Sequence, residues 1–160
     1  MEETFNITVE MLKVKGACAS GMRDFLKEFP REQYPDGADY QEVLNRCAEH
    51  KRPNYAEWLL NEFGATNTTL SVDEINTDGY VFFAGRIEAR GKIRCKAIRA
   101  ACSIKAGWGI KAGEGIKAGE DFGVYAGLAV RLSYKSKYAQ ITAKEKPANI
   151  ICGEWVPFDD

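Results

Sequence analysis

An apolar side chain recurs at six-residue intervals through the middle of the chain. The recurring positions are Val81, Ile87, Ile93, Ile98, Ile104, Ile110, Ile116, Phe122 and Leu128, with a single five-residue step between Ile93 and Ile98. A small or modest apolar residue follows two positions later in most units, at Ala89, Cys95, Ala100, Ala106, Ala112, Ala118, Val124 and Val130. Internal repetition outranks other signals, because it indicates one structural unit used many times.

A unit with apolar residues at its first and third places predicts a short strand followed by a corner. Strand side chains alternate between two faces, so the two apolar places share one face. Gly107, Gly109, Gly113, Gly115 and Gly119 occupy remaining places, where we expect their permissive backbone dihedrals to turn the chain. This plan is that of a β-solenoid, in which three units per coil would give three coils. A meander of hairpins is the alternative, although hairpins recur at about 8 to 12 residues.

The first third of the chain has other periodicities. Apolar and polar residues alternate after Phe5, which predicts a strand over residues 4–14. Apolar residues at helical spacing then predict three helices, over residues 20–29, 39–50 and 53–63. Asp39 followed by Glu42 forms a capping box at the start of the second helix.

The aromatic residues of this region permit two interpretations. Tyr40, Tyr55 and Trp58 could line a recognition site, because rings and carboxylates often do so. Core packing is the better interpretation, because so small a head needs its large side chains inside.

The two flanks of the repeats are less regular. Residues 65–80 are polar and contain an incomplete first rung, and residues 134–143 predict a hairpin or a last irregular rung before a final strand over 149–156. The predicted fold class is α+β, with a short β-solenoid of six-residue repeats capped by a small N-terminal α/β head. The expected parts are an acidic helical head with one N-terminal strand (1–66), basic solenoid repeats (67–133) and C-terminal strands that cap the solenoid (134–160).

The Ile-Lys-Ala-Gly units that begin at Ile104, Ile110 and Ile116 resemble those of bactofilin-type, polymer-forming cytoskeletal proteins. The resemblance covers residues 81–130 and implies self-assembly. Left-handed β-helix acyltransferases and carbonic anhydrases are more distant, because they favour a small residue two places before the aliphatic one. Those places hold Trp108, Glu114 and Glu120 here. Repeats behind a helical head are also similar to uncharacterised bacterial and mobile-element proteins.

Composition describes a globular protein, with 45% hydrophobic and 28% charged residues in 160. No apolar run approaches the roughly 18 residues of a membrane span, and Met-Glu-Glu does not begin an export signal, so we expect a cytoplasmic protein without membrane contact. The five cysteines contain no close CxxC pair, which favours reduced and mostly buried thiols.

Charge is divided unevenly along the chain. Residues 1–80 carry eight basic and fifteen acidic residues, whereas residues 81–130 carry nine basic and four acidic ones. Either the head and the repeats attract each other, or the repeats offer a basic surface to a polyanion.

Catalytic chemistry finds little support. His50 is the single histidine and is expected to face solvent at a helix end, and Cys95 falls on an inward place, which predicts an inert thiol. The Gly-rich strings lack the ending of a phosphate loop, and the acidic residues lack a calcium-loop spacing. We therefore expect no enzyme, no cofactor and no metal site.

The outward places of the repeats supply the candidate partner-binding residues, which are Arg94, Arg99, Lys105, Lys111 and Lys117, together with Trp108 at a corner. A three-sided coil would stack Arg94 with Lys111 and Arg99 with Lys117, whereas a flattened two-sided coil would stack Lys105 with Lys117. Trp108 either folds over its corner or is exposed for base stacking or as a protein hot spot.

These features predict a non-catalytic protein-interaction module that presents a rigid β-solenoid surface to another protein or complex. A phage or mobile-element inhibitor of a host defence complex, such as a CRISPR effector, is a specific version. The alternatives are a bactofilin-like self-assembling scaffold, hence a homo-oligomer, and nucleic-acid binding through the basic solenoid. The acidic head opposes the last of these.

Overall fold

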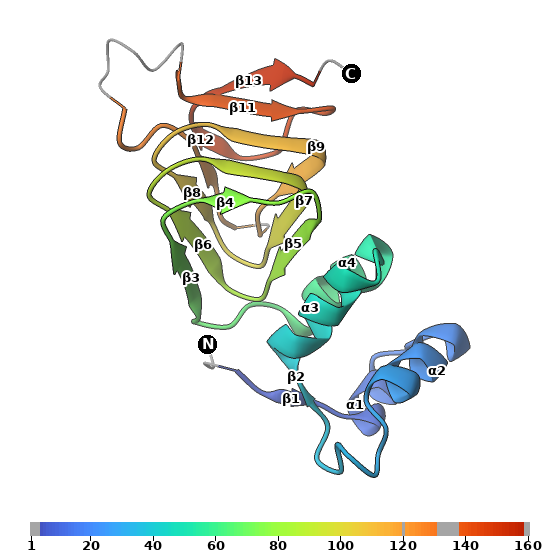
Figure 1. The fold of residues 1–160 in the computed structure, drawn as a ribbon. Coiled ribbons are helices and arrows are strands. Elements are labelled where there is room, and N and C mark those ends of the chain that lie inside the picture. The colour runs from blue at the N-terminus through green and yellow to red at the C-terminus, as the bar shows by residue number, and fades with distance from the viewer. Residues whose placement is uncertain (1–3, 120, 131–137, 159–160) are drawn as a thin grey trace.

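The structure is a computed structural model that describes residues 4–119, 121–130 and 138–158. A helical head lies beside the first coil of a stack of short strands, and the stack then rises away from the head (Figure 1). The strand stack is a parallel β-solenoid of about five turns, as the six-residue pattern predicts in kind. In the described part of the chain, no helix combines the length and the apolarity that crossing a membrane requires.

The head contains four helices and one small sheet. In chain order its elements are β1 (Asn6–Ile7), α1 (Val9–Val14), α2 (Ala19–Glu28), β2 (Ala38–Asp39), α3 (Tyr40–Glu49) and α4 (Pro53–Phe63), with β1 antiparallel to β2. The Asp39 carboxylate caps α3 by accepting a hydrogen bond from the Glu42 amide, as the capping box predicts.

The predicted strand over residues 4–14 is wrong beyond Ile7. The Thr8 hydroxyl accepts a hydrogen bond from the Met11 amide and so caps α1. The buried residues of α1 are Val9 and Leu12, which lie three positions apart. Their helical spacing competes with the alternation, and the cap decides in favour of the helix.

The solenoid has three sides. The first side contains β3 (Thr69–Val72), β6 (Arg86–Ala89), β8 (Ile104–Ala106), β10 (Val124–Tyr125) and β12 (Ile150–Cys152). The second contains β4 (Ile75–Asn76), the first halves of β7 (Ile93–Ala100) and β9 (Ile110–Lys117), β11 (Gln140–Ala143) and β13 (Glu154–Pro157). The third contains β5 (Tyr80–Phe83) and the second halves of β7 and β9.

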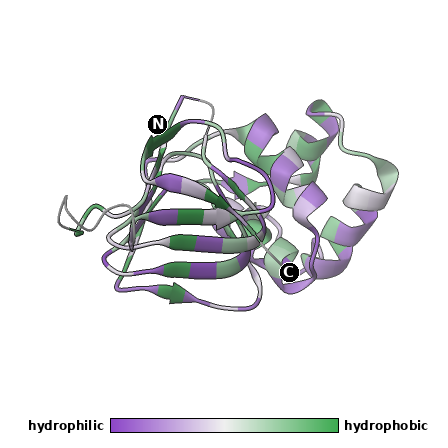
Figure 2. Ribbon diagram, turned by 90° about the horizontal axis from the view of Figure 1, so that it is seen from above, coloured by the Kyte–Doolittle hydropathy of each residue, from purple (hydrophilic) through white to green (hydrophobic). Residues whose placement is uncertain are grey.

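Isoleucines of successive coils stack in register inside these sides. Ile87 pairs with Ile104, Ile93 with Ile110 and Ile98 with Ile116, at separations of 17 or 18 residues. All six are buried in one core, and hydrophobic and hydrophilic residues alternate along the strands (Figure 2). Because each of these pairings is parallel, the hairpin meander is wrong.

The stack extends beyond the repeats at both ends, where the sequence predicts an incomplete first rung and a final strand. Strands β3 and β4 before the repeats and β11 to β13 after them add coils, so the stack has about five turns rather than three. Residues 134–137 lie outside the described residues, whereas residues 140–143 join β9 as a parallel rung, so a last rung is confirmed there and a hairpin is wrong. Leu128 is 51% exposed and Phe122 lies outside the core, because Val124 and Ala126 fill the inward places there.

The glycines of the corners serve a purpose that we did not predict. Gly107 and Gly119 have ordinary negative φ angles. An added Cβ at Gly107 would lie 1.8 Å from the Arg90 carbonyl oxygen, and at Gly119 it would lie 1.9 Å from the Ala101 oxygen. Glycine is needed here because the backbone of the preceding coil passes so close, and not because of a left-handed turn.

The head is fixed to the third side of the first coil. The Gln41 side chain of α3 donates to the Phe82 carbonyl and accepts from the Ala84 amide, at 2.8 and 2.9 Å. Phe82 points away from the solenoid and is buried in the core of the head, with 3% of its surface exposed. One strand, β5, therefore contributes to both cores and joins them.

Candidate functional site

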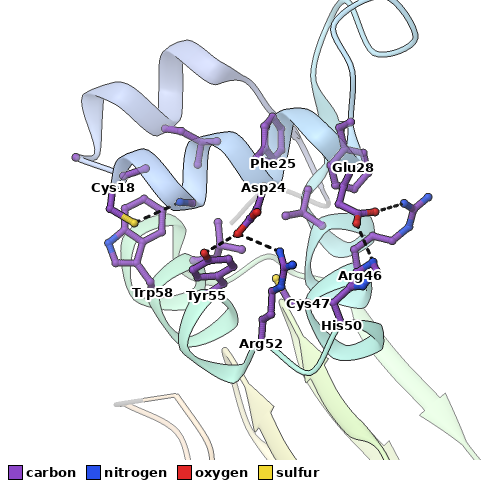
Figure 3. A pocket seen from close by; sticks show the side chains of 17 residues that line it. Cys18, Asp24, Phe25, Glu28, Arg46, Cys47, His50, Arg52, Tyr55 and Trp58 are labelled. Atoms are coloured by element: carbon purple, nitrogen blue, oxygen red, sulfur yellow. Dashed lines mark hydrogen bonds and ion pairs between the residues drawn. The ribbon is translucent and has the colours of Figure 1, made fainter.

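A groove lies in the head between α2 on one side and α3 and α4 on the other (Figure 3). Its volume is about 220 Å³, and its walls include Phe25 of α2, Val43 and Cys47 of α3, and Trp58 and Leu59 of α4. Helix α2 has an amphipathic sequence, yet none of its ten residues is buried. We call this cavity the head groove; it exists because the apolar face of α2 is only partly covered by its neighbours.

Two carboxylates of α2 connect it to the opposite wall. Glu28 accepts a hydrogen bond from Arg46, at 3.0 Å, and lies 2.8 Å from Nε2 of His50. The contact with Glu28 raises the pKa of Arg46. The pair sits at one end of the head groove, so this end is polar but its charges are matched.

The second carboxylate lies further along α2. Asp24 accepts a hydrogen bond from the Tyr55 hydroxyl, at 2.8 Å, and forms an ion pair with Arg52, at 3.3 Å. The hydrogen bond to Asp24 raises the pKa of Tyr55, because the phenol must give up a bonded proton to ionise. Both carboxylates are thus occupied, and the space between them is lined by carbon.

Cys18 marks the other end of the head groove, beside Trp58 (Figure 3). It is exposed and caps α2, and its Sγ lies 3.3 Å from the Ser20 hydroxyl and 3.4 Å from the Gly21 amide nitrogen. These contacts, Ser20 first, lower the pKa of the Cys18 thiol. Burial instead raises the pKa of Cys47 in the groove wall to about 11.

Arg94 and Lys111, two of the predicted partner-binding residues, lie next to each other on the second side of the solenoid. Arg94 is hydrogen-bonded to Asn76 and Asp78, and the Lys111 ammonium lies 5.4 Å from the centre of the Phe158 ring. The stacking predicted for a three-sided coil is confirmed. Asp78 offsets the like charges of the ladder.

Arg99 and Lys117 stack on the third side, again as a three-sided coil predicts. They face α4 of the head, where the Lys117 ammonium donates to Glu57 at 2.7 Å. The acidic head and the basic solenoid therefore attract each other at this point.

Lys105 and Trp108, the last two predicted partner-binding residues, lie apart from the other four. Lys105 lies on the first side, with its ammonium 5.2 Å from the centre of the Tyr125 ring. Trp108 follows β8 at a corner, is 39% exposed and makes an edge contact with Tyr138 at 5.3 Å between ring centres. The six residues thus occupy all three sides and a corner rather than one continuous patch.

Cys18, Cys47 and His50 line the head groove, whereas Cys95 lies in the core of the solenoid. Over residues 4–119, 121–130 and 138–158, no three histidine, cysteine or acidic side chains gather closely enough to hold a metal ion. Cys95 is buried as predicted, and burial raises its pKa to about 12. The head groove is lined mostly by carbon, with the charged groups of Glu28 and Asp24 paired to residues of the opposite wall.

The two interpretations of the aromatic residues both hold in part. Tyr40 is fully buried, and Tyr55 and Trp58 pack against the core of the head while they also line the head groove. The amphipathic pattern of α2 was visible, whereas the distance between its apolar face and the next helices was not. Such a distance depends on tertiary packing alone.

The comparison with family models gives one match. Residues 1–67, which end just before β3, match the model of the YdhT N-terminal domain. No significant match to the chain was found among curated proteins or among solved structures. The match covers the head alone, so the resemblance of the repeats to bactofilins stays a prediction.

Proposed function

We propose that the protein is a non-catalytic protein-interaction module whose head groove receives an amphipathic helix of a partner protein. The observation that carries the proposal is that α2 is amphipathic but buries none of its residues beside a carbon-lined cavity. Helix-in-groove recognition uses such surfaces, with apolar anchors at positions i, i+3 or i+4 and i+7. The solenoid would hold the head rigidly through β5.

The size of the head groove favours side-chain anchors over a free small molecule. Pockets for drug-sized ligands have volumes of about 300–1,000 Å³. The head groove, at about 220 Å³, is smaller and is suited to one or two large side chains. Residues 1–80 carry a net charge of −7, which favours a partner helix with a basic polar face. An inhibitor of a bacterial defence complex is one specific form of this function.

A displayed library of helical peptides tests the proposal. Peptides are selected on the wild-type protein and then compared on Gly21→Leu, which adds an isobutyl group to the α2 wall of the groove. We expect the selected peptides to have helically spaced apolar residues flanked by Lys and Arg, and to bind Gly21→Leu about tenfold or more weakly.

Lys111→Glu, on the second side of the solenoid, is the matched control and should leave this binding unchanged. Selected peptides that bind wild type and Gly21→Leu equally well would contradict the proposal. A partner that copurifies from cells should be lost with the same variant.

Self-assembly through the far end of the solenoid is a second candidate function. Strand β13 is the last strand of its sheet within the described residues and pairs there with β11 alone, so its other backbone edge lies at the end of the stack. Ile151 of β12 is also 63% exposed. Open edges of this kind favour pairing with another chain.

Light scattering across concentration tests this second candidate. A mass that rises with concentration and falls back to the monomer in Ile151→Lys would support self-assembly. A strict monomer at high concentration would exclude it.

A further inference from the structure

A second cavity, of about 520 Å³, lies where α4 of the head meets the third side of the solenoid. Glu57, Leu60 and Asn61 of α4 line it from the head, and Arg99, Lys117 and Phe122 line it from the solenoid. It shares no lining residue with the head groove. We call it the junction cavity.

Arg99 is the unusual residue of the junction cavity. Its side chain runs along the outside of β9, with its terminal nitrogens 3.6 and 4.0 Å from the position that a Cβ on Gly115 would take. In the described parts of the chain, its Nε is the single buried side-chain nitrogen or oxygen without a hydrogen-bond partner. Buried polar groups in folded proteins are nearly always hydrogen-bonded, so this exception requires a cause.

The described acidic residues around Arg99 are either paired with another group or exposed. Glu57 is bound by Lys117 at 2.7 Å, and the pKa of Glu57 is lowered first by that hydrogen bond and less by the charge of Arg99. Asp121 lines the outer part of the cavity and is exposed. None of the ion pairs found among the described residues includes the Arg99 guanidinium.

We propose that the junction cavity binds a small organic anion through its phosphate or carboxylate group. The guanidinium of arginine presents its N–H groups in planar forks that fit two oxygens of such a group. Arg99 lines the cavity and would thereby gain an anionic partner, which it lacks among the described residues. The Lys117 ammonium lies beside it and adds a second positive charge, which Glu57 attenuates.

The rest of the cavity defines the class of ligand. Leu60, Ala100, Ala118 and Phe122 form an apolar wall, which suits an anion with a carbon body better than a bare ion. Because the two walls come from the head and from the solenoid, a bound anion would connect the two parts and raise the melting temperature. This site is independent of the proposed docking of a helix in the head groove.

Calorimetric titration with inorganic phosphate, succinate and a nucleoside monophosphate tests the proposal. We expect at least one of the three to bind wild type at up to millimolar concentration. The order of the three affinities tells whether a phosphate or a carboxylate is preferred and whether a larger body helps. Arg99→Gln should weaken that binding about tenfold or more, because a charge-assisted two-oxygen contact is lost.

Two further variants separate binding from folding. Glu57→Gln should strengthen the same binding severalfold, because it frees the charge of Lys117. Arg90→Gln removes an exposed arginine that pairs with Asp73 elsewhere on the solenoid, and should leave binding unchanged. Without ligand, Arg99→Gln should melt at or above the temperature of wild type, because it removes an unsatisfied buried N–H.

Two results would contradict an anion site in the junction cavity. No binding of any of the three anions at millimolar concentration would do so, as would equal binding by wild type and Arg99→Gln. Either outcome leaves the head groove untouched, since peptide binding there is measured separately.

Discussion

The head and the solenoid have cores of opposite kinds. In the solenoid, Ile87, Ile104 and Val124 occupy one stacked column, and each residue packs on a similar one of the next coil. In the head, dissimilar aromatic residues meet at tilted or edge angles, as Tyr40 does with Phe5 and Phe63. The solenoid exposes large apolar side chains singly, as at Trp108, Leu128 and Ile151, whereas the irregular core of the head leaves a groove along α2. The two proposed binding sites therefore lie in the head and at its junction with the solenoid.

Shortening a stacked isoleucine should give the largest effect. Ile104 is fully buried between two coils, so we expect Ile104→Ala to lower the free energy of unfolding by about 2–5 kcal/mol. Phe25→Ala in α2 removes a larger side chain that is only partly buried, and should cost less than Ile104→Ala. Chemical denaturation followed by circular dichroism measures both. Equal costs would mean that α2 is as tightly packed as the solenoid.

Two glycines of the solenoid allow a matched pair of substitutions to alanine. Gly107→Ala would force the Arg90 carbonyl away and should destabilise the protein by about 1–3 kcal/mol. Gly113 has a negative φ, and an added Cβ there would have its nearest neighbours at 3.9 Å. Gly113→Ala should therefore be neutral or stabilising by about 0.4–1 kcal/mol. Melting curves of the two variants decide, and similar losses would refute the close-approach explanation.

The Tyr40 hydroxyl should contribute to the stability of the head. The Tyr40 hydroxyl donates within reach of two carbonyl oxygens, at 3.2 Å from Leu59 and 2.9 Å from Gly64, and burial raises its pKa. Tyr40→Phe should cost about 1–2 kcal/mol, because these buried acceptors lose their donor. Urea denaturation measures the loss. An unchanged midpoint would show that the end of α4 is satisfied in another way.

The contact between Glu57 and Lys117 should make a small contribution to stability that is lost at acidic pH. The pKa of Glu57 is lowered in the folded protein, so its pair with Lys117 contributes stability above the unfolded pKa, near 4.5. That contribution is lost as the pH falls through the lower folded value. Comparing the stability of wild type and Glu57→Gln from pH 3 to 7 should show a smaller acid-induced loss in the variant. Because Glu57 is partly exposed, the difference will be small, and identical pH profiles would argue against the contact.

Features that depend on a regular spacing along the chain could be predicted from the sequence, whereas features that depend on one particular contact could not. The stacking of Arg94 on Lys111 was one of two arrangements that the six-residue period allows, and the three-sided coil of the structure decides between them. The helix after Thr8 was not predictable, because alternation and helical spacing were both present and a single hydroxyl cap decided between them. The φ angles of Gly107 and Gly119 were also mispredicted, since a sequence shows that glycine is required but not which backbone lies against it.

The solenoid and the three longer helices of the head follow from the sequence, because the periodic placement of apolar residues indicates each of them. The three-sided cross-section, the incomplete cover of α2 and the burial of Phe82 in the core of the head follow only from tertiary packing. The same holds for the Arg99 Nε, which is buried without a hydrogen-bond partner among the described residues. These features depend on how unlike surfaces meet across long separations in sequence, and no local period encodes that meeting.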